Sequence, residues 1–211
     1  MKQLLKQLES IDMPTRHLLL KRLQEFQAFK TKGQKEWLSE LIYCILTSNS
    51  KGATAFTIQQ EIDKKGIDNL TVEEVTQIIR KNNHRFHNTK AERIIKAREY
   101  KDIKEKIQKI VQKEGVCGAR TWLIKTVEGI GMKEASHYLR NTGHDGLAIL
   151  DRHIISTLKE NGIIDEEPKT LDTKTYLDIE KKFLGLSKKL NIRPAELDLT
   201  LWYLKSGIVL K

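Results

Sequence analysis

Thr-Val-Glu-Gly-Ile-Gly-Met-Lys-Glu-Ala, residues 126–135, places two glycines around one apolar residue, between two segments with helical patterning. Glycine allows the positive φ and the close backbone approach of a tight turn. The amides of such a turn, and those that open the next helix, lack helical partners and attract anions such as phosphate. We expect Ile130 to pack between the helices. The stretch predicts either a two-helix hairpin that binds a DNA phosphate through Gly129 and Gly131, or a glycine-capped turn with an exposed Lys133.

The segments on both sides of this stretch are also helical in pattern, and the chain predicts an all-α fold. Apolar residues recur at helical spacing, and only 3 prolines occur in 211 residues. A Thr-Val-Glu-Glu capping box opens one of the segments. The apolar runs 147–150 and 207–210 are the only ones that could be strands instead. Helices are expected over 13–29, 37–46, 71–80, 89–112, 119–127, 132–141, 151–159, 173–190 and 194–206.

The composition indicates a globular chain with a polyanionic partner. The chain has 38 Lys and Arg against 28 Asp and Glu, a net charge of +10. Nucleic acid is the first candidate and an anionic membrane surface the second, although a lysine-rich surface without a specific partner also explains the charge. Cys44 and Cys117 form neither a disulfide framework nor a metal cluster, which fits a reducing, cytoplasmic compartment. No apolar run has the length of a signal or membrane-spanning segment, so we expect no membrane insertion.

A second informative stretch, residues 141–153, reads Asn-Thr-Gly-His-Asp-Gly-Leu-Ala-Ile-Leu-Asp-Arg-His. A glycine-bearing loop leads through an apolar run to Asp151, and His153 follows two residues later. We expect the Asp151 carboxylate to cap the next helix. Capping does not exclude chemistry, because a capping carboxylate is rigidly aimed.

The hairpin resembles the helix-hairpin-helix DNA-binding motif. With Lys133, the glycine-bearing loop and Asp-x-His, the chain resembles the helix-hairpin-helix-GPD DNA glycosylase superfamily, although its loop lacks the proline of that name. The resemblance implies that Lys133 is the nucleophile, that Asp151 is the catalytic carboxylate and that His153 lies near the DNA backbone. Cleavage of the glycosidic bond builds positive charge on the sugar, which a carboxylate stabilises. A lysine amine can attack C1′ and form a Schiff base, which permits β-elimination.

Two further stretches extend the resemblance. Residues 45–50 occupy the place where the superfamily carries a polar residue that fills the gap left by a flipped base. Asn49 is the candidate for this role, or else an ordinary cap of the next helix. Residues 85–91 resemble the superfamily's aromatic-x-x-Lys-Ala step into a helix. Phe86 is therefore expected either to stack on a base or to lie in the core.

The small size, the lack of a four-cysteine iron–sulfur cluster and the chain's end at Lys211 resemble the compact 8-oxoguanine glycosylase/lyase branch of archaea and some bacteria. Guanine offers an acceptor at N7, whereas 8-oxoguanine carries a hydrogen there, so a fixed acceptor in the pocket favours the lesion. The resemblance implies that the terminal carboxylate of Lys211 lies by the damaged base; a frayed terminus is the alternative. Trp202 is either a stacking wall or a core residue.

We therefore expect an all-α enzyme of two helical lobes, residues 49–141 and residues 1–48 with 142–211, separated by a basic DNA-binding cleft. The expected activity is excision of 8-oxoguanine from double-stranded DNA by Schiff-base chemistry at Lys133, with β-elimination of the strand. The enzyme is expected to act as a monomer without a metal or other cofactor. The alternatives are a glycosylase for another oxidised or alkylated base, a non-catalytic helix-hairpin-helix module and a general basic adaptor.

Overall fold

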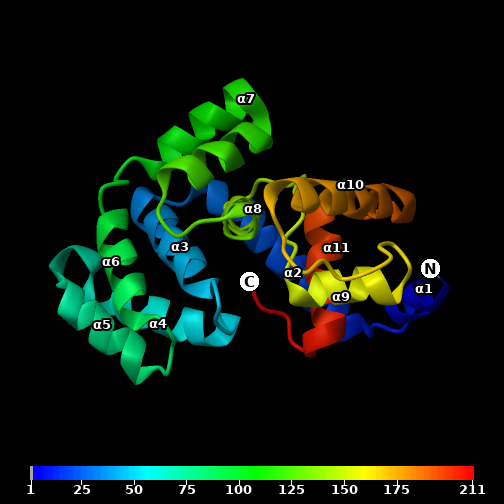
Figure 1. The fold of residues 1–211 in the computed structure, drawn as a ribbon, viewed down its shortest axis with the longest axis horizontal. Helices are drawn as coiled ribbons and strands as arrows, with labels where there is room; N and C mark the ends of the chain where they lie inside the picture. The colour runs from blue at the N-terminus through cyan, green and yellow to red at the C-terminus, as the bar shows by residue number, and fades with distance from the viewer. Residues whose placement is uncertain (1) are drawn as a thin grey trace. The chain divides into compact units, whose positions relative to one another are not determined.

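The computed structural model describes residues 2–211 apart from the side chain of Lys2, and this range contains helices and no strand (Figure 1). The predicted all-α fold is confirmed. The α-helices are α1 (Lys2–Glu9), α2 (Met13–Ala28), α3 (Gln34–Thr47), α4 (Gly52–Lys65), α5 (Val72–Lys81), α6 (His87–Ala97), α7 (Ile103–Thr126), α8 (Met132–Asn141), α9 (Arg152–Glu160), α10 (Thr173–Leu190) and α11 (Pro194–Ser206), with short 3-10 helices at Phe29–Thr31 and Ile67–Asn69. Within the described range, no helix is both long and apolar enough to cross a membrane.

The helices form two compact units. The first unit combines Met1–Lys30 with Gly143–Lys211, and the second is Thr31–Thr142. The second unit begins earlier than the lobe expected at residues 49–141. This difference arises because α3 packs against α4, α6, α7 and α8, all of which belong to the second unit.

In the second unit, α3 is the central helix. All of its residues from Trp37 to Thr47 except Ser39 are buried. The ring of Trp37 meets that of Tyr138 in α8 edge-on, with centroids 6.1 Å apart. The Tyr138 hydroxyl also donates to the backbone oxygen of Trp37 (3.3 Å). Buried aromatic area of this kind contributes strongly to stability, so the position of α8 follows from that of α3.

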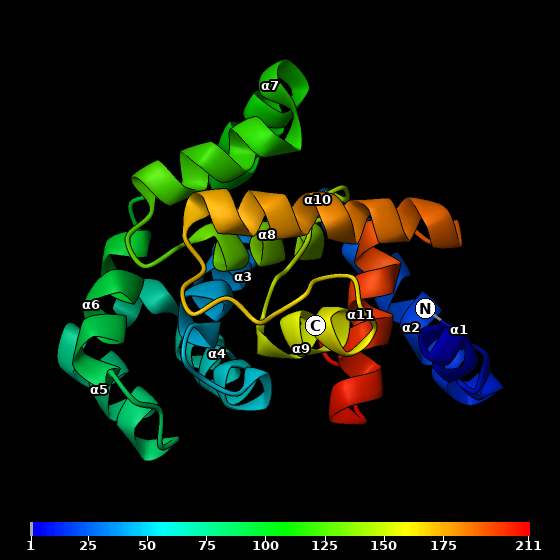
Figure 2. The same ribbon diagram turned by 45° about the vertical axis from the view of Figure 1, so that its right-hand side comes forward.

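In the first unit, segments from the two ends of the sequence share a core. Leu19, Leu23 and Phe26 of α2 pack with Ala195 and Leu199 of α11. Helices α9 and α10 also contact α11, and Figure 2 shows α10 and α11 crossing. The burial of these apolar side chains holds the unit together although its two segments are far apart in the sequence.

Most helices lie where the pattern predicted them, and those over 132–141, 173–190 and 194–206 have the predicted bounds. The single helix predicted over 89–112 was wrong, because α6 ends at Ala97 and α7 begins at Ile103. The break turns the chain so that Ile103 and Ile107 become fully buried. Helix α7 then runs to Thr126 and includes all but the last residue of the predicted helix at 119–127; it is kinked at Gly115, where φ is 72°.

Gly143 offers a test of the first unit's packing. Its φ is +88°, and a Cβ there would lie 2.8 Å from the backbone oxygen of Phe26. Gly143→Ala should therefore lower the free energy of unfolding by roughly 1–3 kcal/mol. Gly185 in α10 is the matched control, since a Cβ there meets nothing within 4 Å. Gly185→Ala should raise the free energy of unfolding by about 0.5–1 kcal/mol. Denaturant titrations measure both, and equal effects of the two substitutions would contradict this assignment.

Candidate active site

The predicted hairpin is present between α7 and α8. Gly129 has a φ of +85°, a backbone conformation that favours glycine. Ile130 is only 5% exposed, as expected for a residue packed between the two helices. Its amide donates to the backbone oxygen of Val127 (3.3 Å) and closes the turn.

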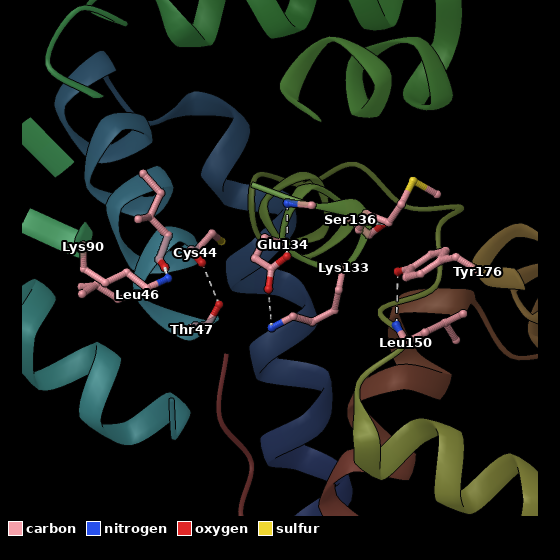
Figure 3. Close-up of polar contacts among 12 residues, drawn as sticks. Cys44, Leu46, Thr47, Lys90, Lys133, Glu134, Ser136, Leu150 and Tyr176 are labelled. Atoms are coloured by element: carbon pink, nitrogen blue, oxygen red, sulfur yellow. Dashed lines mark hydrogen bonds and ion pairs between the residues drawn. The ribbon is translucent and has the colours of Figure 1, made fainter. Parts of the chain in front are cut away.

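Lys133 lies in the first turn of α8, and its side chain is only 23% exposed. Its Nζ is 3.1 Å from Oε1 of Glu134, whose side chain is 12% exposed. Oε2 of Glu134 accepts the Gly131 amide (3.2 Å), which is the glutamate half of a capping box, since Gly131 has no side chain to supply the other half (Figure 3). We name this half the capping box. Adjacent side chains on a helix usually point apart. Here the capping box turns Glu134 back toward the N-terminus, where it holds the amine of Lys133.

The capping box changes what was expected of the turn. The sequence predicted that its amides are free for a phosphate, yet Ile130 and Gly131 both donate within the chain. A phosphate that binds at Gly131 must therefore replace the carboxylate of Glu134. The glutamate at N3, which is half of the capping-box pattern, was readable in the sequence but was not applied to this helix.

A buried lysine lies near this pair. Lys90 of α6 is 2% exposed, and its Nζ donates to the backbone oxygen of Ile45 at the end of α3 (2.5 Å). Burial lowers the pKa of Lys90 to about 8; the charges of Arg93 and Lys133 also lower it, and Glu134 opposes them. Figure 3 shows its side chain reaching this helix end. In the sequence, Lys90 stands at an apolar position of its helix face. Within the stretch 85–91, however, only Phe86 was chosen as a candidate.

Asn49 and Phe86 are exposed and have positive φ angles, 59° and 60°. Asn49 does not cap α4, whose N-cap is Lys51 without a side-chain hydrogen bond. The capping alternative is therefore wrong. Phe86 is 55% exposed, so the core alternative is wrong as well. Both side chains are available for contacts outside the chain.

In the first unit, Asp151 is the N-cap of α9, as predicted. Its Oδ1 accepts the amides of His153 and Ile154, both at 2.9 Å. Both bonds use the same oxygen. Oδ2 makes no hydrogen bond to any other residue in the described part of the chain, so the carboxylate is fixed in direction and keeps one oxygen for another partner.

Two side chains of α10 position the segment that leads to Asp151. Glu180 accepts the Ala148 amide (2.9 Å). The Tyr176 hydroxyl donates to the Ala148 oxygen (2.7 Å) and accepts the Leu150 amide (3.2 Å). The run that could have been a strand is thus an extended segment paired with side chains. Sequence reasoning missed Tyr176 and Glu180, whose signal is two polar groups at i, i+4 spacing on one helix face.

His153 and Trp202 meet in the first unit, with ring centroids 6.2 Å apart and an interplanar angle of 85°. Trp202 is partly exposed, as is Lys211 at the end of the chain. Each unit thus carries its own set of candidates. The second unit holds Asn49, Phe86, Gly129, Gly131 and Lys133, and the first holds Asp151, His153, Trp202 and Lys211. Among the described residues, no group of His, Cys, Asp or Glu is arranged to hold a metal ion.

The pKa of Lys90 predicts a pH-dependent contribution to stability. It lies near 8 in the folded protein, below the ordinary 10.5, so the unfolded chain binds more protons between these values. Relative to Lys90→Met, the wild type should gain free energy of unfolding as the pH rises through this window, on the order of 3 kcal/mol in total. Denaturant titrations of both proteins below, within and above the window check this. A difference between them that does not change with pH would refute it.

Comparisons with known proteins place the chain beside one group of enzymes. Residues 19–192 match the family described as 8-oxoguanine DNA glycosylase. The 8-oxoguanine DNA glycosylase/AP lyase of Methanocaldococcus jannaschii is 43% identical over 99% of each chain. That of Thermotoga maritima is 37% identical over 99% of each chain.

Solved structures agree with these sequence matches. The crystal structure of the Methanocaldococcus jannaschii 8-oxoguanine glycosylase/lyase in complex with a 15mer DNA containing 8-oxoguanine has a TM-score of 0.91 and 41% identity, covering 99% of this chain and 100% of that one. The Thermotoga maritima 8-oxoguanine DNA glycosylase has a TM-score of 0.88 and 35% identity, covering 100% of this chain and 99% of that one.

Proposed function

The chain belongs to the 8-oxoguanine DNA glycosylase family, and from this membership we propose that Lys133 and Asp151 perform its reaction. The protein is a DNA glycosylase and abasic-site lyase that excises 8-oxoguanine. The observation that supports Lys133 as the nucleophile is its place directly after the hairpin, with its partly buried amine held by Glu134 at 3.1 Å.

The reaction begins with the amine of Lys133. Before it attacks, the ammonium gives up a proton, and the carboxylate of Glu134 is placed to accept it. Nζ then bonds to C1′ of the sugar as the C1′–N9 bond breaks and the base leaves with the electron pair. Loss of a second proton from Nζ frees its electron pair, which forms the C1′=Nζ bond as the C1′–O4′ bond breaks; O4′ takes up a proton, and the opened sugar is the Schiff base. Loss of a C2′ proton then expels the 3′ phosphate by β-elimination.

Asp151 stabilises the positive charge that develops on the sugar. Its Oδ1 is committed to the α9 amides, which leaves Oδ2 for this role. Because the cap fixes the carboxylate before DNA arrives, little reorganisation is needed during the reaction. None of these steps draws on a metal or an organic cofactor.

The remaining candidates contact double-stranded DNA or the damaged base, and the protein acts as a monomer. The amides of Gly129 and Gly131 bind a backbone phosphate, and His153 lies near the backbone. Asn49 enters the gap that the rotated nucleotide leaves. This assignment is supported by the exposed, positive-φ conformation of Asn49.

Base recognition uses the aromatic candidates and the chain terminus. Phe86 and Trp202 offer exposed ring area on which a base can stack. The terminal carboxylate of Lys211 accepts the hydrogen on N7 of 8-oxoguanine. Guanine would leave that acceptor unsatisfied, at a cost of roughly 1–3 kcal/mol.

Borohydride trapping on a duplex with 8-oxoguanine opposite cytosine tests the nucleophile. The wild type should form a covalent adduct, and Lys133→Gln should form none because it has no amine. The matched control is Lys189→Gln, which removes an exposed lysine in the last turn of α10 and should trap like the wild type.

The same assay separates the cap of Asp151 from its charge. Asparagine caps helices as well as aspartate does, so Asp151→Asn should fold normally and yet lose at least about a hundredfold in excision rate. Trapping by Lys133→Gln, or full activity of Asp151→Asn, would overturn the assignment of that residue.

Extending the chain beyond Lys211 tests the terminal carboxylate. Added residues convert the carboxylate into an amide and move the charge away. Excision of 8-oxoguanine should fall more than cleavage at a ready-made abasic site, where no base is recognised. Quantifying both rates on matched duplexes decides the matter: an equal loss of both, or no loss, removes Lys211 from base recognition.

A further inference from the structure

The last turn of α3 is completed by side chains. The final carbonyls of a helix have no partner within it. Here the oxygen of Ile45 accepts Lys90 Nζ (2.5 Å), and that of Leu46 accepts His84 Nε2 (2.9 Å). The hydroxyl of Thr47 donates to the oxygen of Cys44 (2.8 Å). We name the contacts of Lys90 and His84 with this helix end the α3 clasp.

The clasp is buried. Lys90 is 2% exposed and His84 is 4% exposed. A lysine ammonium at a helix C-terminus has a favourable charge interaction with the helix dipole. Burying that charge is nevertheless costly, and an apolar side chain of similar volume often serves stability as well or better. The presence of Lys90 therefore points to a role beyond stability.

The clasp joins the end of α3 to α6 and to the loop before α6, and exposed loops follow α3 and precede α6 beside it. The other ring nitrogen of His84 contacts the backbone oxygen of Arg85, so the imidazole links the loop before α6 to the end of α3. Among the described residues, four that are not glycine have positive φ, and three of these lie in the two loops: Asn49, Asn83 and Phe86. Such conformations cost energy and persist where the surroundings over-determine them.

We propose that Lys90, together with His84, is a positioning residue that locks both loops and presents Asn49 and Phe86 in their DNA-binding conformations before DNA arrives. Loops that are ordered in advance do not pay that ordering cost during base rotation. The inference rests on the roles proposed for Asn49 and Phe86. Lys90 itself touches neither DNA nor the reacting atoms.

The test compares Lys90→Met with the wild type. Methionine fills the same volume without the hydrogen bond to Ile45. Excision of 8-oxoguanine from duplex DNA under single-turnover conditions should fall about tenfold or more. Borohydride trapping on a single-stranded abasic oligonucleotide, which needs no base rotation, should stay within about twofold. The matched control is Lys81→Met, which removes a 73% exposed lysine of the same unit and should leave both rates unchanged.

A second readout follows base rotation directly. The fluorescence of 2-aminopurine placed beside the lesion should rise more slowly in Lys90→Met, since the gap-filling loop is no longer ordered. Equal slowing of duplex excision and single-stranded trapping would show general damage to the fold and overturn the proposal. If Lys90→Met does not fold, Lys90→Gln takes its place, because its side chain is one bond too short to make the same hydrogen bond to Ile45, and an unchanged rate of base rotation in that variant would also overturn the proposal.

A double-mutant cycle separates this inference from the function on which it rests. If Asn49→Ala and Phe86→Ala leave excision unchanged, the roles proposed for those residues fail, and the clasp proposal fails with them. If they slow excision, Lys90→Met should add less than about twofold in the doubly substituted background. A full additive loss there would mean that Lys90 acts elsewhere and would refute the clasp alone.

Discussion

The burial of α3 is the constraint on which the second unit depends. Its residues from Trp37 onward are inside the core almost without exception. Helix α8 packs against it through Tyr138, and its final carbonyls are completed by Lys90 and His84. One buried helix therefore locates the amine of Lys133 and both exposed loops, although these lie far apart in the sequence.

In the first unit, polar contacts position the segment that carries Asp151. The extended run before α9 has no neighbouring strand in the described range, so its backbone groups pair with Tyr176 and Glu180 of α10. This arrangement satisfies buried polar groups that would otherwise be costly. It delivers Asp151 to the start of α9 with one oxygen already committed. Both proposed reacting groups thus lie at the N-terminal end of a short helix.

Local signals predicted the parts of the fold that depend on local physics. The hairpin, the cap at Asp151 and the bounds of α8, α10 and α11 follow from glycines, caps and apolar spacing. The break between α6 and α7 was missed because no glycine or proline marks it; the burial of Ile103 in tertiary packing decides it. The partners of Lys90 and Glu134 were missed for the same reason, since a polar residue on a helix does not reveal what it will meet. The exposure of Phe86 likewise depends on its positive φ, a conformation that is uncommon for an aromatic residue and cannot be predicted from its type.

The capping box at the hairpin has a thermodynamic consequence for encounters with DNA. An empty turn would gain the full attraction between its amides and a phosphate, whereas this turn already holds the carboxylate of Glu134 at Gly131. If a phosphate binds there as proposed, it must displace the carboxylate, whose charge stays nearby, so the net gain is smaller than at an empty turn. On the proposed function, the turn therefore contributes little to the total affinity for DNA. Affinity for undamaged DNA then comes mainly from the protein's other Lys and Arg side chains. That part of the affinity falls as the salt concentration rises.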